Sequence, residues 1–243
     1  MDSSLFWTHN DAGNRAELFG LGGDGQVRER VRVTGATLVD WEDLEAARCG
    51  ADPCLYVADI GDNDGERESI TIYRVPEPAA GSSRTVGAEA LRARYPDGPR
   101  DAEALFAAPS GDLFIVTKGR PGPATLYRLP SPQPTDRVAA LERVREIFPE
   151  PDDPDDRVTA ATTTPDGRWV GIRTYRALYL YPLDDLVGTA PLQPRVADLS
   201  SLPGHQGEAI AMANDGTVWL SSEAEDDDAR PLWSRLHCAL TPR

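Results

Sequence analysis

Hydrophobic positions along the chain fall in short runs of about five residues, separated by turns rich in glycine, proline and aspartate. Runs of this length are typical of β-strands, because a helix in a globular domain needs a longer stretch with a period of about 3.6 residues. Between Val27 and Val33, apolar and acidic positions alternate with three arginines, which indicates a half-exposed strand with a basic outer face. The pattern therefore predicts an all-β protein.

One strand pair recurs along the sequence. In each copy, a short apolar strand begins at a polar, mostly acidic residue. A turn follows, and then a second strand ends at a charged residue. The copies span residues 40–59, 101–118 and 206–223, with a degenerate copy at 157–173. The opening residues recur at intervals of about 50 to 60 residues, a spacing typical of a radial array such as a β-propeller. The alternative is a β-sandwich with accidental similarity between the copies.

The predicted strands group into five sets, so we expect one β-propeller domain over residues 1–243, with five blades of four-stranded antiparallel sheets. Six blades are possible if a terminal blade is assembled differently. The first set lacks an inner strand and the last lacks a clear outer one. Two explanations are open. Either terminal segments pair to close the ring, or the chain is truncated at its N-terminus relative to its relatives.

The net charge of the chain limits the kinds of binding partner to be expected. The chain has 40 acidic and 25 basic residues, a formal net charge of −15. This balance argues against nucleic acid, whose phosphates need a basic surface. It favours cations, small ligands or basic partners, although acidity alone also keeps a surface soluble. We expect a monomer.

Neither a membrane span nor an export signal is predicted. No apolar run approaches the roughly 18 residues of a membrane helix, and no signal peptide is visible. Cys49 and Cys54 flank a turn-forming tetrapeptide, so either they form a small-loop disulfide and leave Cys238 free, or all three are free thiols. Two cysteines without further Cys or His partners make a poor zinc site.

The repeat predicts where a site should lie. In a propeller, the start of each inner strand and the end of the next strand meet at the same end of the channel. That geometry gathers eight charged residues and one threonine: Asp11, Glu42, Asp59, Glu103, Lys118, Thr159, Arg173, Glu208 and Glu223. Close carboxylates must be neutralised by protons, cations or basic side chains, and Lys118 and Arg173 neutralise two of them. The surplus predicts a divalent cation, calcium or magnesium. The expected metal ligands are Asp11, Glu42, Asp59, Glu103, Glu208 and Glu223.

An equally weighted alternative gives these residues a structural role, in which they cap strands and bond to backbone amides of neighbouring blades. His9 could supply an acid or base at the same end, or be a hydrogen-bonded structural residue. The acidic run at residues 62–65 does not fit the calcium loop of an EF-hand and is interpreted as a turn. No Gly-x-Ser-x-Gly sequence is present.

The segments WTHND (7–11), DWED (40–43), DIGDN (59–63), DAEAL (101–105) and QGEAI (206–210) resemble those of a family of uncharacterised bacterial propeller proteins. The chain is more distantly similar to the SdiA-regulated and esterase-like phytase groups, which have a comparable acidic element at the start of inner strands. The resemblance covers nearly the whole chain. It implies a further N-terminal inner strand and often an exported or periplasmic location in relatives, features this sequence does not display. It also slightly favours a Cys49–Cys54 pair.

From this pattern we expect an acidic channel mouth that binds a divalent cation and a small ligand. If the protein is an enzyme, the expected activity is metal-assisted hydrolysis of an ester, lactone or phosphoester. Glu42, Glu103 and Glu208 would serve as ligands or base, and Lys118 and Arg173 would stabilise developing negative charge. The alternative is a non-catalytic binding or scaffold propeller.

Overall fold

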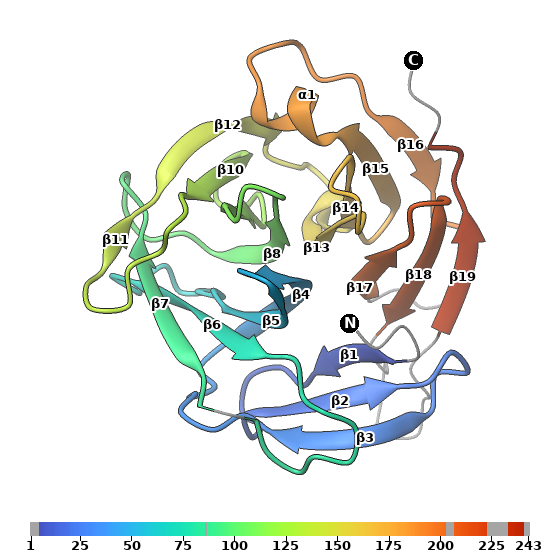
Figure 1. Ribbon diagram of the computed structural model, residues 1–243. Helices are drawn as coiled ribbons and strands as arrows, with labels where there is room; N and C mark the ends of the chain where they lie inside the picture. Colours follow the sequence, from blue (N-terminus) through green and yellow to red (C-terminus); the bar gives the residue numbers. More distant parts are fainter. Residues whose placement is uncertain (1–4, 86, 203–206, 223–232, 241–243) are drawn as a thin grey trace.

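The computed structural model describes residues 5–85, 87–202, 207–222 and 233–240. It is a five-bladed β-propeller whose sheets are arranged around a central axis (Figure 1), as the repeat predicts. Blade 1 contains β1 (Phe6–His9), β2 (Glu17–Leu21) and β3 (Val27–Arg32). Blade 2 contains β4 (Trp41–Cys49), β5 (Asp52–Asp59), β6 (Ile70–Pro76) and β7 (Glu89–Arg94). Blade 3 contains β8 (Ala102–Ala107), β9 (Leu113–Thr117), β10 (Ala124–Leu129) and β12 (Glu142–Phe148).

Blade 4 contains β13 (Val158–Thr163), β14 (Trp169–Thr174), β15 (Ala177–Pro182) and β16 (Arg195–Asp198), and blade 5 contains β17 (Gly207–Met212), β18 (Thr217–Ser222) and β19 (Trp233–His237). Two further features were not predicted from the sequence. The two-residue strand β11 (Ala139–Ala140) leaves blade 3 and pairs in parallel with β7, giving blade 2 a fifth strand. A short helix, α1 (Leu183–Val187), buries Leu183 and Leu186 against blade 4.

Blade 1 lacks an inner strand in the described part of the chain, as the strand pattern predicts. β1 ends beside Asp11, whose carboxylate lies close to Asp40 at the start of β4. β5 likewise ends at Asp59, opposite Trp41 at the start of β4. β1 therefore runs in the same direction as β5 and occupies the position of the second strand of its blade, counted from the axis.

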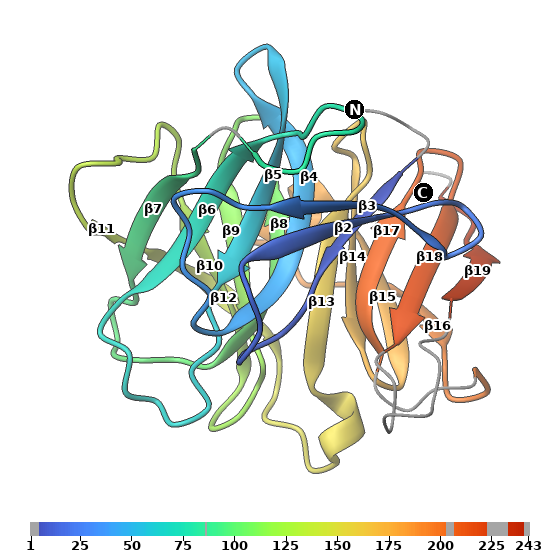
Figure 2. The same cartoon turned by 90° about the horizontal axis from the view of Figure 1, so that it is seen from below.

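The two ends of the propeller differ in the connections between strands that lie there (Figure 2). Inner strands begin at one end, which we call the acidic end, close to the 3-10 helix η1 (Pro154–Asp156) that precedes β13. At the other end, which we call the hairpin end, turns join β4 to β5, β8 to β9 and β13 to β14. Neither helical segment of the described residues is long and apolar enough to span a membrane.

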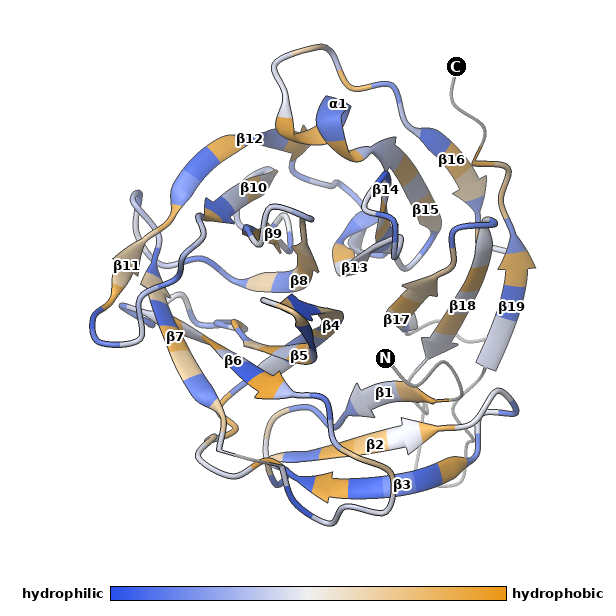
Figure 3. Ribbon diagram, viewed as in Figure 1, coloured by the Kyte–Doolittle hydropathy of each residue, from blue (hydrophilic) through white to orange (hydrophobic). Residues whose placement is uncertain are grey.

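Apolar side chains pack between neighbouring blades, forming four buried clusters that join the consecutive pairs from blade 1 to blade 5. The outer strands β3, β7 and β12 alternate between hydrophilic and hydrophobic residues (Figure 3), as expected for strands with one face in water. Blades 5 and 1 meet through aromatic rings: Phe6 lies 5.0 Å from both Trp219 and Trp233, measured between ring centroids. The ring thus closes by side-chain packing between the first and last blades.

Two buried carboxylates of β4 fasten three inner strands together. Asp43 accepts backbone N–H bonds from Leu105 on β8 at 2.8 Å and from Ala161 on β13 at 3.1 Å. Glu45 accepts the Thr162 hydroxyl at 2.9 Å, and its other oxygen accepts the backbone N–H groups of Thr163 and Ala107. Asp43 and Glu45 thus bond to backbone amides of neighbouring blades, the structural role considered for the acidic residues. The sequence alone did not assign this role to these two residues.

Cys49 and Cys54 form a disulfide across the β4–β5 hairpin, and Cys238 is free. Of the two alternatives left open by the sequence, the structure therefore has the small-loop disulfide.

Replacing Asp43 should destabilise the ring. Asp43→Ala leaves the N–H groups of Leu105 and Ala161 buried without an acceptor, at a cost of roughly 3 kcal/mol in the free energy of unfolding. Asp43→Asn retains one acceptor oxygen and should lose less. Urea unfolding measures both, with the exposed Asp136→Ala as a control expected within about 0.5 kcal/mol of the parent. Equal unfolding midpoints for Asp43→Ala and Asp136→Ala would show that these bonds do not hold the blades.

Candidate functional site

Five carboxylates converge at the acidic end. Asp11, Asp40 and Glu42 form one group, and Glu42, Asp101 and Glu103 form a second; within each group the ligand oxygens all lie within 4.8 Å of one another. Three of these residues were predicted as metal ligands. Asp40 and Asp101 were missed as site residues, although each stands two positions before a predicted glutamate in the same Asp-x-Glu pattern. We call the five residues the carboxylate cluster.

Gly61 forms part of the wall of this cluster. Its backbone N–H donates to the carbonyl oxygen of Asp40 at 3.3 Å. A Cβ at this position would overlap the carboxylates of Glu42 and Asp40. A residue with no side chain is therefore required for the loop after β5 to pass so close to the acidic groups.

Lys118 at the end of β9 neutralises part of the cluster. Its ammonium group pairs with Glu103 and lies 3.6 Å from Asp101. Burial disfavours the charge of Lys118, but the neighbouring carboxylates prevail and raise its pKa. Asp101 in turn accepts the backbone N–H of Asp62 at 2.9 Å. Lys118 therefore joins β9 to the start of β8 and supplies one positive charge.

Glu42 and Glu103 raise each other's proton affinity. Burial raises the pKa of Glu42, and the negative charge of Glu103 and a hydrogen bond to it raise it further. Burial also raises the pKa of Glu103, against the attraction of Lys118. The pair therefore favours the uptake of a proton, and Lys118 favours the charged form of Glu103.

The remaining charge of the cluster is only partly compensated. Burial raises the pKa of Asp40, and the charges of Asp11 and Asp101 add to the effect, while Arg67 opposes it. Arg67 is itself engaged with Asp59, at 2.9 Å, and with the carbonyl oxygen of Gly61, at 2.7 Å. The cluster thus keeps acidic oxygens in excess of its basic neighbours.

Tyr175 is a site residue that the sequence did not reveal. It lies in the turn between β14 and β15, where no motif marks it. Burial raises the pKa of its hydroxyl, and the charge of Glu208 and a hydrogen bond to that carboxylate raise it further. Glu103 and Lys118 also act on Tyr175 electrostatically, which places Glu208 and Tyr175 on the side of the cluster facing blades 4 and 5.

Arg173 is buried between blades 4 and 5. One guanidinium nitrogen donates to the carbonyl oxygens of Ala209 and Ser221, each at 2.7 Å. Gly207 makes room for it, because a Cβ there would overlap the guanidinium group. Burial lowers the pKa of Arg173 to about 10, opposed by the charge of Glu208. Arg173 therefore fixes the start of β17, which carries Glu208.

Asp59 and His9 also lie at the acidic end. Asp59 accepts the backbone N–H groups of Val39 at 3.2 Å and Asp40 at 3.1 Å, besides its ion pair with Arg67. The His9 ring packs edge-on against Trp41, with 5.8 Å between centroids, and burial lowers its pKa. Thr159 donates its hydroxyl to the carbonyl oxygen of Gly207 at 2.7 Å. Glu223, predicted as a ligand, lies outside the described residues.

No known protein family and no curated protein sequence matches this chain. Among solved structures it is similar to streptogramin B lyase, with 7% identity and a TM-score of 0.44 over 100% of this chain and 67% of that one. It is similar to a calcium-binding protein, regucalcin, from Agrobacterium tumefaciens, with 16% identity and a TM-score of 0.46 over 96% and 70% of the two chains.

A protein assigned as TolB from Agrobacterium tumefaciens has 14% identity and a TM-score of 0.46, over 97% of this chain and 74% of that one. Likenesses at this level of identity carry no activity over to this chain.

The raised acidic pKa values predict an unusual dependence of stability on pH. Burial raises the pKa of Asp43 to about 7 and that of Glu45 to about 8, so between about pH 4 and pH 8 the folded chain binds more protons than the unfolded chain. The free energy of unfolding should then fall as pH rises through this range, each such group contributing about 1.4 kcal/mol per pH unit.

Urea unfolding at pH 5, 6, 7 and 8, in the presence of EDTA, measures this slope. The double variant Asp43→Asn, Glu45→Gln removes both titrations and should show a shallower slope than the parent. Stability that rises from pH 5 to pH 8 in the parent would contradict the assignment.

Proposed function

We propose that this propeller binds a divalent cation, calcium or magnesium, at its acidic end. The observation that carries the proposal is the carboxylate cluster, in which two groups of three acidic side chains share Glu42. The donors are all carboxylate oxygens, the ligands that calcium and magnesium prefer. A bound cation would replace the proton that Glu42 otherwise holds, because coordination favours the charged form of the ligand.

Asp11, Asp40 and Glu42 are the better placed of the two groups to act as ligands. Glu103 and Asp101 already share the charge of Lys118, whereas Asp11 and Asp40 have no ion pair within the described residues. Asp11 is exposed and Asp40 is half-buried, so the cation would enter from solvent. Glu42 then connects the cation to the pair formed by Glu103 and Lys118.

We further propose that the bound cation serves the hydrolysis of a small ester, lactone or phosphoester. A cation at this position would polarise the substrate oxygen and lower the pKa of water. Glu208 is half-exposed and hydrogen-bonded to Tyr175, so this pair could accept and return a proton at the edge of the cluster. Lys118 keeps its proton and holds positive charge beside the site.

A scaffold without catalysis is the second candidate, and specific contacts favour it. Asp59 and Arg173 were both predicted as site residues. Each forms hydrogen bonds with the backbone of neighbouring segments. In that case the acidic end would hold the blades together and bind its cation only for stability. The two candidates differ in whether turnover depends on Glu208.

Cation binding should raise thermal stability. For protein stripped with EDTA, a cation at a hundred times its dissociation constant adds about 2.7 kcal/mol to the free energy of unfolding. For a chain of this size that corresponds to a rise in Tm of roughly 5 °C or more. Differential scanning fluorimetry with calcium, magnesium or manganese measures it.

The double variant Asp40→Asn, Glu42→Gln should lose most of this rise. The matched control Asp136→Asn, Glu142→Gln removes two exposed carboxylates far from the cluster and should keep it. Failure of every cation to raise the Tm of the parent would refute the cation site.

Turnover distinguishes the hydrolase from the scaffold. Esters, lactones and phosphoesters would be screened with the stabilising cation present. For any substrate hydrolysed, Glu208→Gln should lower kcat by about a hundredfold or more while the Tm rise with the cation persists. Glu146→Gln, an exposed position on β12, is the matched control. An unchanged kcat in Glu208→Gln would rule out this carboxylate as the proton acceptor.

A further inference from the structure

The described strands leave one position open in the ring of inner strands. β4, β8, β13 and β17 contact one another in sequence around the axis, while blade 1 begins with a second strand, β1 (Figure 1). The place between β17 and β4 therefore has no inner strand among the described residues. In that part of the chain β1 pairs with β2 alone, so its edge toward the axis has no strand beside it.

Burial of the four inner strands reflects this gap. Every residue of β8 is buried, and so is every residue of β13 except the last. These two strands have inner strands on both sides. β4 and β17 border the gap, and each leaves residues partly exposed, including Leu44, Ala46, Ala209 and Ala211. An inner strand is thus fully buried only where neighbours lie on both sides of it.

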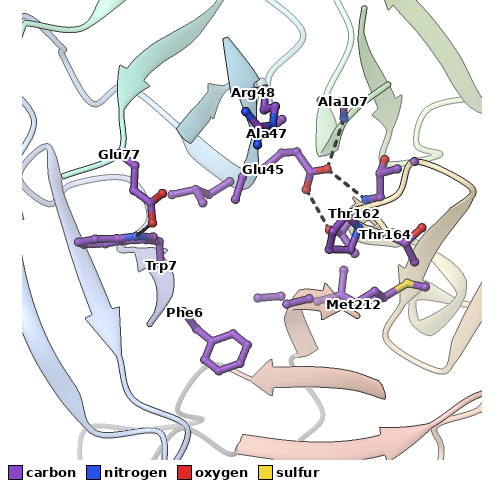
Figure 4. A pocket seen from close by; sticks show the side chains of 18 of the residues that line it. Phe6, Trp7, Glu45, Ala47, Arg48, Glu77, Ala107, Thr162, Thr164 and Met212 are labelled. Carbon is purple, nitrogen blue, oxygen red and sulfur yellow. Dashed lines mark hydrogen bonds between the residues drawn. The ribbon is translucent and has the colours of Figure 1, made fainter. Parts of the chain in front are cut away.

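A cavity of about 670 Å³ occupies this position. It is lined by residues of β1, β4, β17 and β18 and by the turns at the hairpin end, and it does not include the carboxylate cluster. Phe6, Trp7 and Met212 surround it, and Glu45 lies at its inner wall (Figure 4). It is a separate site from the acidic end, and its lining combines apolar and aromatic side chains with the charged Glu45, Arg48, Glu77 and Asp166.

We propose that this cavity receives an extended peptide segment, which pairs with the edge of β1 that has no neighbour among the described strands and takes the place of the inner strand of blade 1. An exposed strand edge offers unpaired backbone N–H and C=O groups, and a peptide backbone satisfies them in register where a small apolar molecule does not. Addition of a strand to a sheet edge is a common mode of peptide recognition.

The inner strands themselves define the chemistry of this peptide. Alanines recur in the inner strands β4, β8, β13 and β17: Ala46, Ala47, Ala102, Ala104, Ala160, Ala161, Ala209 and Ala211. A strand entering between Ala46 and Ala211 would have an inner strand close on each side, so it needs small side chains on that face. On its other face, larger apolar side chains would reach the aromatic rings of Phe6 and Trp219. The segment is therefore extended, rich in alanine and free of proline.

The test uses a fluorescein-labelled peptide with the sequence of residues 101–108, DAEALFAA, which is that of an inner strand of this chain. Fluorescence anisotropy should show saturable binding, and hydrogen exchange should slow at residues 6–9 when the peptide is present. A peptide of the same sequence with prolines in place of its second and third alanines should not bind, because proline lacks the N–H and cannot pair on both edges.

A protein variant locates the binding. Ala46→Trp places a large ring in the cavity from an exposed position, so the chain should still fold, and it should weaken binding at least about tenfold. Ala140→Trp, on the outermost strand β11, is the matched control and should bind like the parent. Saturable binding that survives Ala46→Trp, or no saturable binding to the parent, would overturn the proposal. Neither result depends on the cation, so failure here leaves the acidic end untouched.

Discussion

The arrangement of the inner strands depends on a carboxylate buried where they meet. Asp43 belongs to β4 but accepts hydrogen bonds from the backbones of β8 and β13, so one side chain ties three blades. Inner strands of a propeller converge at an angle, which leaves backbone N–H groups facing the axis without a ladder partner. A short acidic side chain reaches these groups, and Glu45 repeats the arrangement nearer the hairpin end. Burial removes both carboxylates from water and so disfavours their charged forms. For this reason the pKa values of Asp43 and Glu45 are raised.

The same acidic pattern has different consequences at different depths of the channel. Inside, each carboxylate is satisfied by N–H groups and hydroxyls of its neighbours, and it holds the fold. At the acidic end, Glu42 and Asp40 face other carboxylates instead, which raises the pKa of both, and Lys118 compensates part of the charge. Alternate residues of one strand, β4, therefore divide between fastening the ring and forming the cluster.

The sequence was informative wherever a local pattern controls the outcome. Short apolar runs and a repeated acidic position predicted five blades and the end at which Asp11, Glu42 and Glu103 meet, since strand direction alone places them there. It was uninformative where contacts join distant segments. Nothing in the sequence near Asp43 specifies Ala161 as its partner, and Tyr175 sits in a turn whose position follows only from the assembled blades. Arg173 was predicted as a counter-charge, and its additional bonds to the backbone of blade 5 are not visible locally.

The gap in blade 1 also follows from strand direction rather than composition. Because β1 runs toward the acidic end, as β5 does, it stands one place away from the axis, and the position beside it is left to a cavity. The ring nevertheless closes, since Phe6 packs against Trp219 and Trp233 at the outer side of that cavity. Among the described residues, closure by aromatic packing leaves the axial edge of β1 without a neighbouring strand, whereas closure by an inner strand would have occupied that edge. The two ends of the channel are thus chemically distinct: one gathers carboxylate oxygens, and the other has a strand edge beside a cavity lined by apolar, aromatic and charged side chains.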